Sequence, residues 1–238
     1  MELTKTGVIG LDELLGGGIP KGWTTILSGE PGAGKTCLSI GFLVEGVRQY
    51  NENGIFLSFN ESRKELLSTQ KSFGYHLEKY EKEQKIRILD FSYGKALGQG
   101  QIALQQGKLD LPGLTKELKE AINDTNATRL VIDPLTIITL LFDDVREVRY
   151  NFIRFFDVIR RFGVTSIAIT ESTGLTDYTI EDFLASGVIR LYNERTGSKR
   201  QRGIEIIKMR GIKHKRGVFP FSITEKGVLI SPDVELPS

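Results

Sequence analysis

The 238-residue sequence has few of the groups that mark secreted or zinc-binding proteins: one cysteine, Cys37, and two histidines, His76 and His214. A single cysteine excludes an intrachain disulfide and fits a reducing compartment, so we expect a cytoplasmic protein. So few cysteines and histidines provide no Cys/His cluster for zinc. No apolar run approaches the roughly 20 residues of a membrane span, and the N-terminus lacks the apolar core of a signal peptide, so we expect no membrane partner.

The net charge is also low, at +2, but the positive residues are unevenly distributed along the chain. Residues 195–216 contain nine lysines and arginines and a single acid, Glu205. This concentration predicts an anionic partner, and the alternative is a solvated hairpin that binds nothing.

The most informative segment is rich in glycine and matches the phosphate-binding pattern GxxxxGK[ST]. It reads Gly29-Glu30-Pro31-Gly32-Ala33-Gly34-Lys35-Thr36. The β-branched and apolar residues before it predict a buried strand over 23–28, and apolar residues at helical spacing predict a helix over 37–50. Backbone N–H groups of such a loop and the N-terminus of such a helix bind phosphate oxygens.

This arrangement predicts a site for ATP or ADP, with a nucleotide-binding segment that runs from Gly29 to Cys37. We expect Lys35 to reach the β- and γ-phosphates and the Thr36 hydroxyl to ligate Mg²⁺. The length and the hydrophobic content of 39% fit one domain over residues 1–238. Its expected parts are an N-terminal segment (1–22), a nucleotide-binding core (23–170) and a C-terminal β region (187–231).

The remaining apolar runs predict an α/β fold with a mostly parallel, twisted sheet flanked by helices, because several of them lack polar alternation. Further strands are expected at 54–59, 86–91, 129–133 and 164–170, with helices at 62–73, 112–123 and 144–162. Successive runs at 187–193, 203–209 and 218–223 predict an antiparallel edge. Residues 92–111 have glycines without a period and are predicted to form a long loop.

Acidic residues at strand ends are candidates for metal binding and catalysis. Asp133 follows an apolar run and is expected to hold Mg²⁺ opposite the phosphate loop. The strand over 54–59 is expected to lie beside the phosphate-loop strand, which would place Asn60 and Glu61 near the attacking water. Glu61 could act as a general base, or it could be a first-turn acid of the next helix. Glu171 is a second candidate, for orienting water or sensing phosphate.

A pair of cations late in the chain suggests a contact between subunits. Lys208 and Arg210 lie two residues apart near the end of an apolar strand, so we expect their side chains on one face. Such a pair suits the γ-phosphate of a nucleotide bound by a neighbouring subunit, as an arginine finger does. The alternative is a general anion patch or a surface pair.

These residues together resemble KaiC-like proteins of the RecA superfamily. Residues 6–22, with the run Gly16-Gly17-Gly18-Ile19-Pro20, are similar to that family's TG…GLD-L-GGG-P-G segment, and residues 208–214 resemble its KxRGxxH segment. The resemblance covers nearly the whole chain. It implies a RecA-type core and a homo-oligomeric ring, commonly a hexamer, with ATP between subunits. It also implies that Lys208, Arg210 and His214 contact the nucleotide of the next protomer.

The sequence departs from the family pattern at two places. The family has a Glu-Glu pair where this chain has Asn60-Glu61, so either Glu61 takes over as the base or ATP acts as a switch in a slow ATPase. Asp182-Phe183 stands where the clock protein has its phosphorylated Ser-Thr pair. We therefore expect no clock-type autokinase activity. A second domain of the family is absent from the sequence, so a timekeeping role is not expected.

Four functions are compatible with these sequence features. The leading hypothesis is a slow, oligomeric RecA-like ATPase whose nucleotide state is read by a protein partner that the sequence does not identify. The second is a RecA/RadA paralogue that binds single- or double-stranded DNA in repair or recombination, although the segment 172–182 has no lysine or arginine to hold phosphate. The third is a hydrolysis-deficient signalling scaffold, and the fourth is a small-molecule P-loop kinase.

Overall fold

A computed structural model describes residues 1–92, 104–105, 108–109, 111–142, 144–171 and 179–237. The strands of the main sheet are β3 (Thr24–Gly29), β4 (Gly54–Ser58), β5 (Ile86–Asp90), β8 (Arg129–Asp133), β9 (Thr165–Glu171), β10 (Gly187–Thr196), β11 (Lys199–Met209), β12 (Val218–Thr224) and β13 (Gly227–Ile230). The helices are α1 (Leu11–Leu14), α2 (Lys35–Tyr50), α3 (Arg63–Lys71), α4 (Leu77–Lys82), α6 (Leu111–Thr125), α7 (Val145–Arg161) and α8 (Ile180–Leu184), with a 3₁₀ helix, η1 (Leu135–Leu141).

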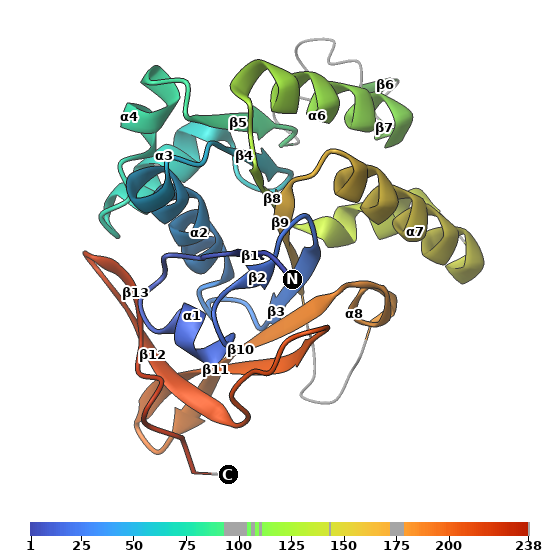
Figure 1. Ribbon diagram of the computed structural model, residues 1–238. Helices are drawn as coiled ribbons and strands as arrows, with labels where there is room; N and C mark the ends of the chain where they lie inside the picture. Colours follow the sequence, from blue (N-terminus) through green and yellow to red (C-terminus); the bar gives the residue numbers. More distant parts are fainter. Residues whose placement is uncertain (93–103, 106–107, 110, 143, 172–178, 238) are drawn as a thin grey trace.

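The described strands form a nine-stranded sheet in the order β13-β12-β11-β10-β3-β9-β8-β4-β5. Every neighbouring pair from β10 to β5 is parallel, whereas β10–β11, β11–β12 and β12–β13 are antiparallel. This confirms the predicted fold class, a mostly parallel sheet with a C-terminal antiparallel edge (Figure 1).

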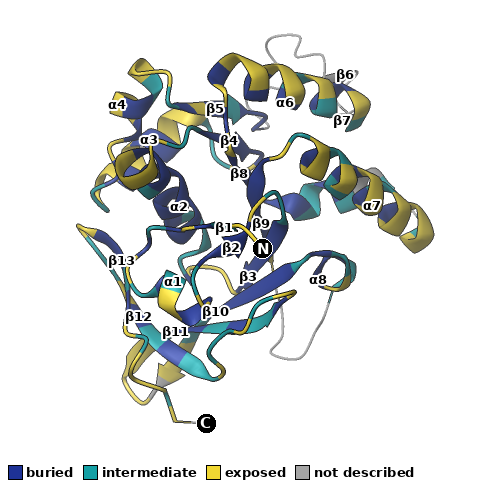
Figure 2. Cartoon of the chain, viewed as in Figure 1, coloured by how far each residue is buried: buried dark blue, intermediate teal, exposed yellow. Residues whose placement is uncertain are grey.

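Helices cover both faces of the sheet, and two buried clusters fill the space between (Figure 2). Successive residues of a strand point to opposite faces, so Leu27 belongs to the cluster under α2 and Ile26 to the cluster under α6 and α7. The same division separates Val131 from Ile132 on β8. This two-sided burial explains why the parallel strands have almost no polar alternation.

The strand order corrects one prediction. The strand that ends before Asn60, β4, does not lie beside the phosphate-loop strand, because β9 and β8 pair in sequence between β3 and β4. The connection through α2 therefore skips two positions of the sheet. Apolar periodicity identifies strands but not their order, which is why the sequence could not place this one.

Short elements account for most other differences from the predictions. The run Gly16–Pro20 ends in strand β2 (Ile19–Pro20), which pairs antiparallel with β1 (Leu3–Thr4) instead of forming only a turn. Helices α4 and α8 and the 3₁₀ helix were not predicted, because elements of five to seven residues carry too few periods to detect. Within the predicted loop 92–111, two short strands, β6 (Leu104–Gln105) and β7 (Lys108–Leu109), form an antiparallel pair. Much of the rest of this segment lies outside the described residues.

A fully buried arginine fastens the N-terminal segment to the core. The side chain of Arg129, at the start of β8, donates hydrogen bonds to the Glu52 carboxylate at 2.7 Å and to the carbonyl oxygens of Phe42 and Lys5 at 2.7 Å each. Its guanidinium also lies 4.5 Å from the ring centroid of Phe42. The N-terminal segment is therefore held by buried, charge-assisted hydrogen bonds.

We expect Arg129→Met to lower the free energy of unfolding by about 3 kcal/mol, because it leaves buried acceptors without a donor while keeping much of the side-chain volume. Urea denaturation would measure the loss. Arg87→Met is the matched control: Arg87 pairs with Asp124 at an exposed position, so its loss should cost well under ~1 kcal/mol. Equal losses in the two variants would contradict the assigned role of Arg129.

Candidate functional site

The phosphate loop connects β3 to α2 in a shape that requires glycine. Gly34 is the residue that caps α2, with φ of +103°, and a Cβ there would lie 2.5 Å from Ile223 Cδ1. A Cβ on Gly29 would lie 2.5 Å from the carbonyl oxygen of Leu191 on β10. Close packing against the C-terminal strands therefore excludes side chains at both positions, and the backbone of the loop stays exposed to a ligand.

Lys35 and Thr36 begin α2 and make contacts that a nucleotide would replace. Lys35 Nζ donates to the carbonyl oxygens of Gly29 at 2.7 Å and Glu30 at 3.0 Å, so its ammonium group lies across the loop. The Thr36 hydroxyl donates to Asp133 Oδ2 at 2.7 Å. The structure thus brings together the predicted residues Lys35, Thr36 and Asp133, although Thr36 and Asp133 are 97 residues apart in the sequence.

The site combines one cation with several acids at the carboxyl edge of the parallel strands. Gly29 pairs with Glu171 in the β3–β9 register, and Asp133 pairs with Ser58 in the β8–β4 register. Burial lowers the pKa of Lys35, and nearby Glu171 and Asp133 oppose that shift. Burial raises the pKa of Asp133 to about 6, against the hydrogen bond from Thr36. Negative charge on Asp133 therefore carries an energetic cost that a bound cation would relieve.

Glu61 and Asn60 differ in their surroundings. Asn60 is exposed, whereas the Glu61 Oε2 atom is buried and has no hydrogen-bond partner among the described residues. Burial raises the pKa of Glu61, and the Glu61 charge in turn raises the pKa of Asp133, so the two carboxyl groups share one region. Ser62 caps α3, so Glu61 precedes that helix, and the interpretation of Glu61 as a first-turn acid is wrong.

Lys208 and Arg210 lie together, but beside the amino-terminal end of β3, whereas the phosphate loop follows its carboxyl-terminal end. Met209 pairs with Gly187, which pairs with Thr25 near the start of β3, whereas the loop follows the end of β3. Lys208 donates to the carbonyl oxygens of Asp182 and Phe183, and Arg210 donates to Phe183 at 3.0 Å. Because strands rise about 3.3 Å per residue, these cations lie more than ~13 Å along the sheet from their own phosphate loop.

The third predicted contact residue, His214, lies in the segment that follows Arg210. Its Nδ1 is 3.0 Å from the Lys215 carbonyl oxygen, and the Lys215 amide donates to Leu14 on α1 at 2.8 Å. The Lys215 ammonium contacts Glu13 and Asp233. His214 is therefore held by packing of residues 213–215 against α1, and not by α8.

The basic segment 195–216 does not form one patch. Arg195, Lys199 and Arg200 lie at the tip of the β10–β11 hairpin, and Lys208 and Arg210 lie at its base. The strand β11 that separates them has 11 residues, which is roughly 30 Å of extended chain. The cations are therefore spread along the hairpin, and an anionic partner of this segment stays a prediction. Residues 172–178, where RecA-like proteins were expected to hold DNA, lie outside the described residues.

Several residues beside the phosphate loop were missed by the sequence analysis. Ile223 on β12 packs against Gly34, Asn193 lies within 3.7 Å of the Cβ position of Gly32, and the charge of Arg202 acts on buried Cys37. Burial raises the pKa of the Cys37 thiol to about 12, so this residue is inert packing. No motif marks these neighbours, because they reach the loop only through the β10–β3 pairing.

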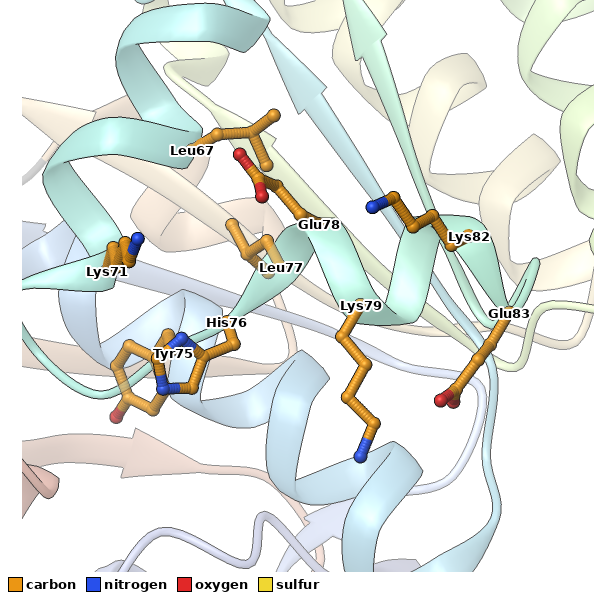
Figure 3. A pocket seen from close by; sticks show the side chains of 9 residues that line it. All are labelled: Leu67, Lys71, Tyr75, His76, Leu77, Glu78, Lys79, Lys82 and Glu83. Carbon is orange, nitrogen blue, oxygen red and sulfur yellow. The ribbon is translucent and has the colours of Figure 1, made fainter.

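A hollow between α3 and α4 is the most visible alternative site (Figure 3). Its volume is about 440 Å³, and Lys71, Lys79 and Lys82 line it together with Glu78 and Glu83. Figure 3 shows these charged groups pointing in different directions, and three cations are mixed with two acids. Because a phosphate site needs convergent donors, this hollow does not compete with the loop.

The donor set at the loop suits Mg²⁺. This ion prefers oxygen ligands and takes only one or two from the protein, with phosphates and water completing the octahedron. The Thr36 hydroxyl and the Asp133 carboxylate, already 2.7 Å apart, would supply those two oxygens. Among the described residues there is no cluster of three or more His, Cys, Asp or Glu that could hold a metal without phosphates.

A glycine loop between a central parallel strand and a helix, with a strand-terminal acid opposite, defines a P-loop nucleotide-binding core of the RecA type. Comparison with known proteins gives the family. The sequence profile described as "ATPase: KaiC" matches residues 4–235, and the chain belongs to this family.

The comparisons also give relatives and a structural neighbour. The circadian clock oscillator protein KaiC of Parasynechococcus marenigrum is 36% identical over 231 residues, which is 95% of this chain and 44% of that protein. KaiC of Synechococcus elongatus is 34% identical over 232 residues. The crystal structure of a KaiC-like protein from the archaeon Pyrococcus horikoshii superimposes with a TM-score of 0.82 at 32% identity, covering 97% of this chain and 99% of that one.

The chain spans under half the length of the curated relatives that it matches. Their timekeeping activity therefore does not transfer with the family. None of the helices in the described residues is long and apolar enough to cross a membrane.

Proposed function

We propose that the protein is an oligomeric ATPase that binds Mg²⁺–ATP between subunits, turns it over slowly and uses the nucleotide as a conformational or assembly switch. The Thr36–Asp133 hydrogen bond, with Lys35 across the loop, carries this proposal. The Thr36 hydroxyl and the Asp133 carboxylate would hold Mg²⁺ in place of the hydrogen bond between them, and Lys35 would exchange the loop carbonyls for the γ-phosphate. When bound, the ion would neutralise phosphate charge and orient the γ-phosphate.

The placement of Lys208 and Arg210 supports a site shared by two subunits. These cations lie beside the amino-terminal end of β3, so they cannot reach the nucleotide of their own protomer. In a head-to-tail assembly, the opposite edges of neighbouring sheets face each other, as a heterologous interface requires. The cations of one protomer would then meet the γ-phosphate held by the next, and a ring of such contacts would be closed and homo-oligomeric.

Slow turnover follows from the residues available to activate water. Asn60 cannot accept a proton, and Glu61 is the acid beside it, with a pKa that burial raises, which makes it a stronger base. Glu171, exposed at the end of β9 and next to Gly29, is placed to sense the γ-phosphate. A site whose general base stands one position later than in the family pattern would hydrolyse ATP slowly. The ATP-bound form would then be long-lived, as a switch requires.

The test is ATP binding measured by calorimetry with Mg²⁺ and with EDTA. We expect Asp133→Asn to lose about tenfold of the affinity that Mg²⁺ adds and to leave binding in EDTA nearly unchanged, because the amide can still accept from Thr36 but carries no charge. Lys35→Ala should weaken binding about 100-fold in both buffers, since it removes a direct phosphate contact.

Lys71→Ala, in the hollow between α3 and α4, is the control and should bind as the wild type does. Equal weakening in Mg²⁺ and EDTA for Asp133→Asn would contradict the metal role. No binding by the wild-type protein would overturn the proposed function.

A further inference from the structure

The outer face of α7 has a composition that its packing does not explain. The inner face packs on the sheet through Val148, Phe152, Phe155 and Ile159. The opposite face looks away from the molecule and is exposed along the length of the helix (Figures 1 and 2). On it, Val145, Tyr150 and Ile153 are 66%, 59% and 48% exposed. Three large apolar side chains on one free helix face mark a contact surface, whereas single ones do not.

Arginines alternate with these apolar residues. Residues four apart lie one above the other on a helix, so Val145, Arg149 and Ile153 form one row. Arg146, Tyr150 and Arg154 form the adjacent row. Together the two rows place apolar and positively charged groups in alternation over roughly two turns of helix.

The charge of this face is only partly neutralised. Arg146 pairs with Asp144, and Arg161 pairs with Asp157. Arg149, Arg154 and Arg160 have no carboxylate partner in the part of the chain that the structure describes. The Arg154 guanidinium lies 5.5 Å from the ring of Tyr150, which holds it in place without cancelling its charge.

A hollow at the N-terminal end of the face provides a place for a side chain. Its volume is about 480 Å³, and the residues that line it are Phe142, Asp144, Arg146, Glu147, Tyr150 and Asn151. The Tyr150 ring therefore forms both the end of one row and a wall of the hollow. An apolar side chain of a partner would contact Phe142 and Tyr150 there, whereas its carboxylates would be repelled by Asp144 and Glu147 and would lie toward Arg149 and Arg154.

We propose that this face, defined by Val145, Arg146, Arg149, Tyr150, Ile153 and Arg154, is a docking surface for an acidic amphipathic helix of a partner protein. Carboxylates of the partner would pair with Arg149 and Arg154, and its leucine-like side chains would cover Ile153 and Val145. Nucleic acid would use the arginines and Tyr150 but would leave the two aliphatic side chains without a partner. Arginine and tyrosine are the residues most enriched in protein interfaces.

The position of α7 connects this surface to the nucleotide site. The helix follows β8, which ends at Asp133, and precedes β9, which ends at Glu171. It also packs against η1 and α8, the helix whose carbonyl oxygens hold Lys208 and Arg210. A partner on α7 would therefore act on the elements that carry both halves of the proposed site.

The probe is a fluorescent 18-residue helical peptide of glutamate, leucine and alanine, with its glutamates and leucines on one face, and binding to the full chain is measured by anisotropy. We expect the double variant Arg149→Glu, Arg154→Glu to weaken binding at least about tenfold and Ile153→Ser to weaken it about threefold. Added salt should also weaken it. ATP binding should be unchanged in all variants, which also reports that they fold.

Two controls make the result specific. Lys64→Glu, Lys71→Glu on α3 changes the net charge equally and should leave binding within about twofold. A scrambled peptide of the same composition should bind poorly. The proposal is overturned if the helical peptide does not bind, if the scrambled peptide binds equally, or if the α7 variants bind normally. It is also overturned if a 20-nucleotide oligothymidine binds through the same arginines, or if the double variant changes the oligomer mass in sedimentation velocity.

Discussion

Arg210→Ala is expected to reduce ATP turnover about 10³-fold and to leave ATP binding by each protomer within a few fold, because an arginine finger acts on the transition state of a neighbouring nucleotide. The physical reason is the position of Arg210 at the amino-terminal edge of the sheet, where it donates to Phe183 on its own chain. Steady-state hydrolysis and calorimetry on the same samples would separate the two effects.

A mixing experiment tests the neighbour directly. Lys35→Ala protomers bind ATP about 100-fold more weakly but keep Arg210, whereas Arg210→Ala protomers hold ATP but lack the finger. Mixed assemblies should recover part of the activity, because some interfaces then combine an intact loop with an intact arginine. Arg87→Ala, at an exposed arginine, is the matched control and should be as active as wild type. Full activity of Arg210→Ala, or a mixture as inactive as its components, would refute action between subunits.

Glu61→Gln should have the second large effect, a loss of turnover of about 10³-fold, because general-base catalysis typically contributes 10²–10⁴. The buried Glu61 Oε2 has no hydrogen-bond partner among the described residues, so it retains an unused acceptor that a catalytic water could occupy. Its backbone carbonyl accepts from the Ser58 hydroxyl at 2.6 Å, which fixes the segment at the end of β4. Glutamine keeps the shape and cannot accept the proton, so ATP affinity should change little.

Substitutions at the preceding position complete this test. Asn60→Ala should alter turnover by less than about threefold, since the side chain is exposed and is not expected to act as a base. Asn60→Glu restores the Glu-Glu pair that resembles the family pattern. If Glu61→Gln is silent and Asn60→Glu creates activity in an inactive protein, the base belongs at position 60 and the natural chain is a nucleotide-dependent scaffold.

The sequence was sufficient to predict elements that depend on local pattern. The loop 29–36 and the strand before Asp133 were predicted because phosphate and metal binding require particular residue types at fixed spacing. The amphipathic helix over 144–162 agrees with α7 to within one residue at each end, since its apolar stripe is long and Asp144 caps it. The family resemblance, which rested on residues 6–22 and 208–214, is confirmed by the comparisons.

Relations between distant segments could not be predicted from local pattern. Three of these relations depend on how the strands are arranged. They are the two strands inserted between β3 and β4, the separation of Lys208 from Arg195 along β11, and the packing of Ile223 on Gly34. Buried Arg129 belongs to the same class, because its acceptors come from residues 5, 42 and 52. Periodicity reports which face of an element is buried, but not which segment buries it.

The central position of β3 has a consequence for synthesis on the ribosome. Both of its neighbours come late in the chain: Thr24 meets Ser166, 142 residues later, and Thr25 meets Gly187. Contacts of such long range form late, and chains are made from the N-terminus at about 5–20 residues per second. After the phosphate loop of a nascent chain has been synthesised, many seconds therefore pass before the two strands that flank β3 have been made. Nucleotide affinity should arise only after the strand that begins at Gly187 has been made, so a polypeptide interrupted before it would not sequester ATP.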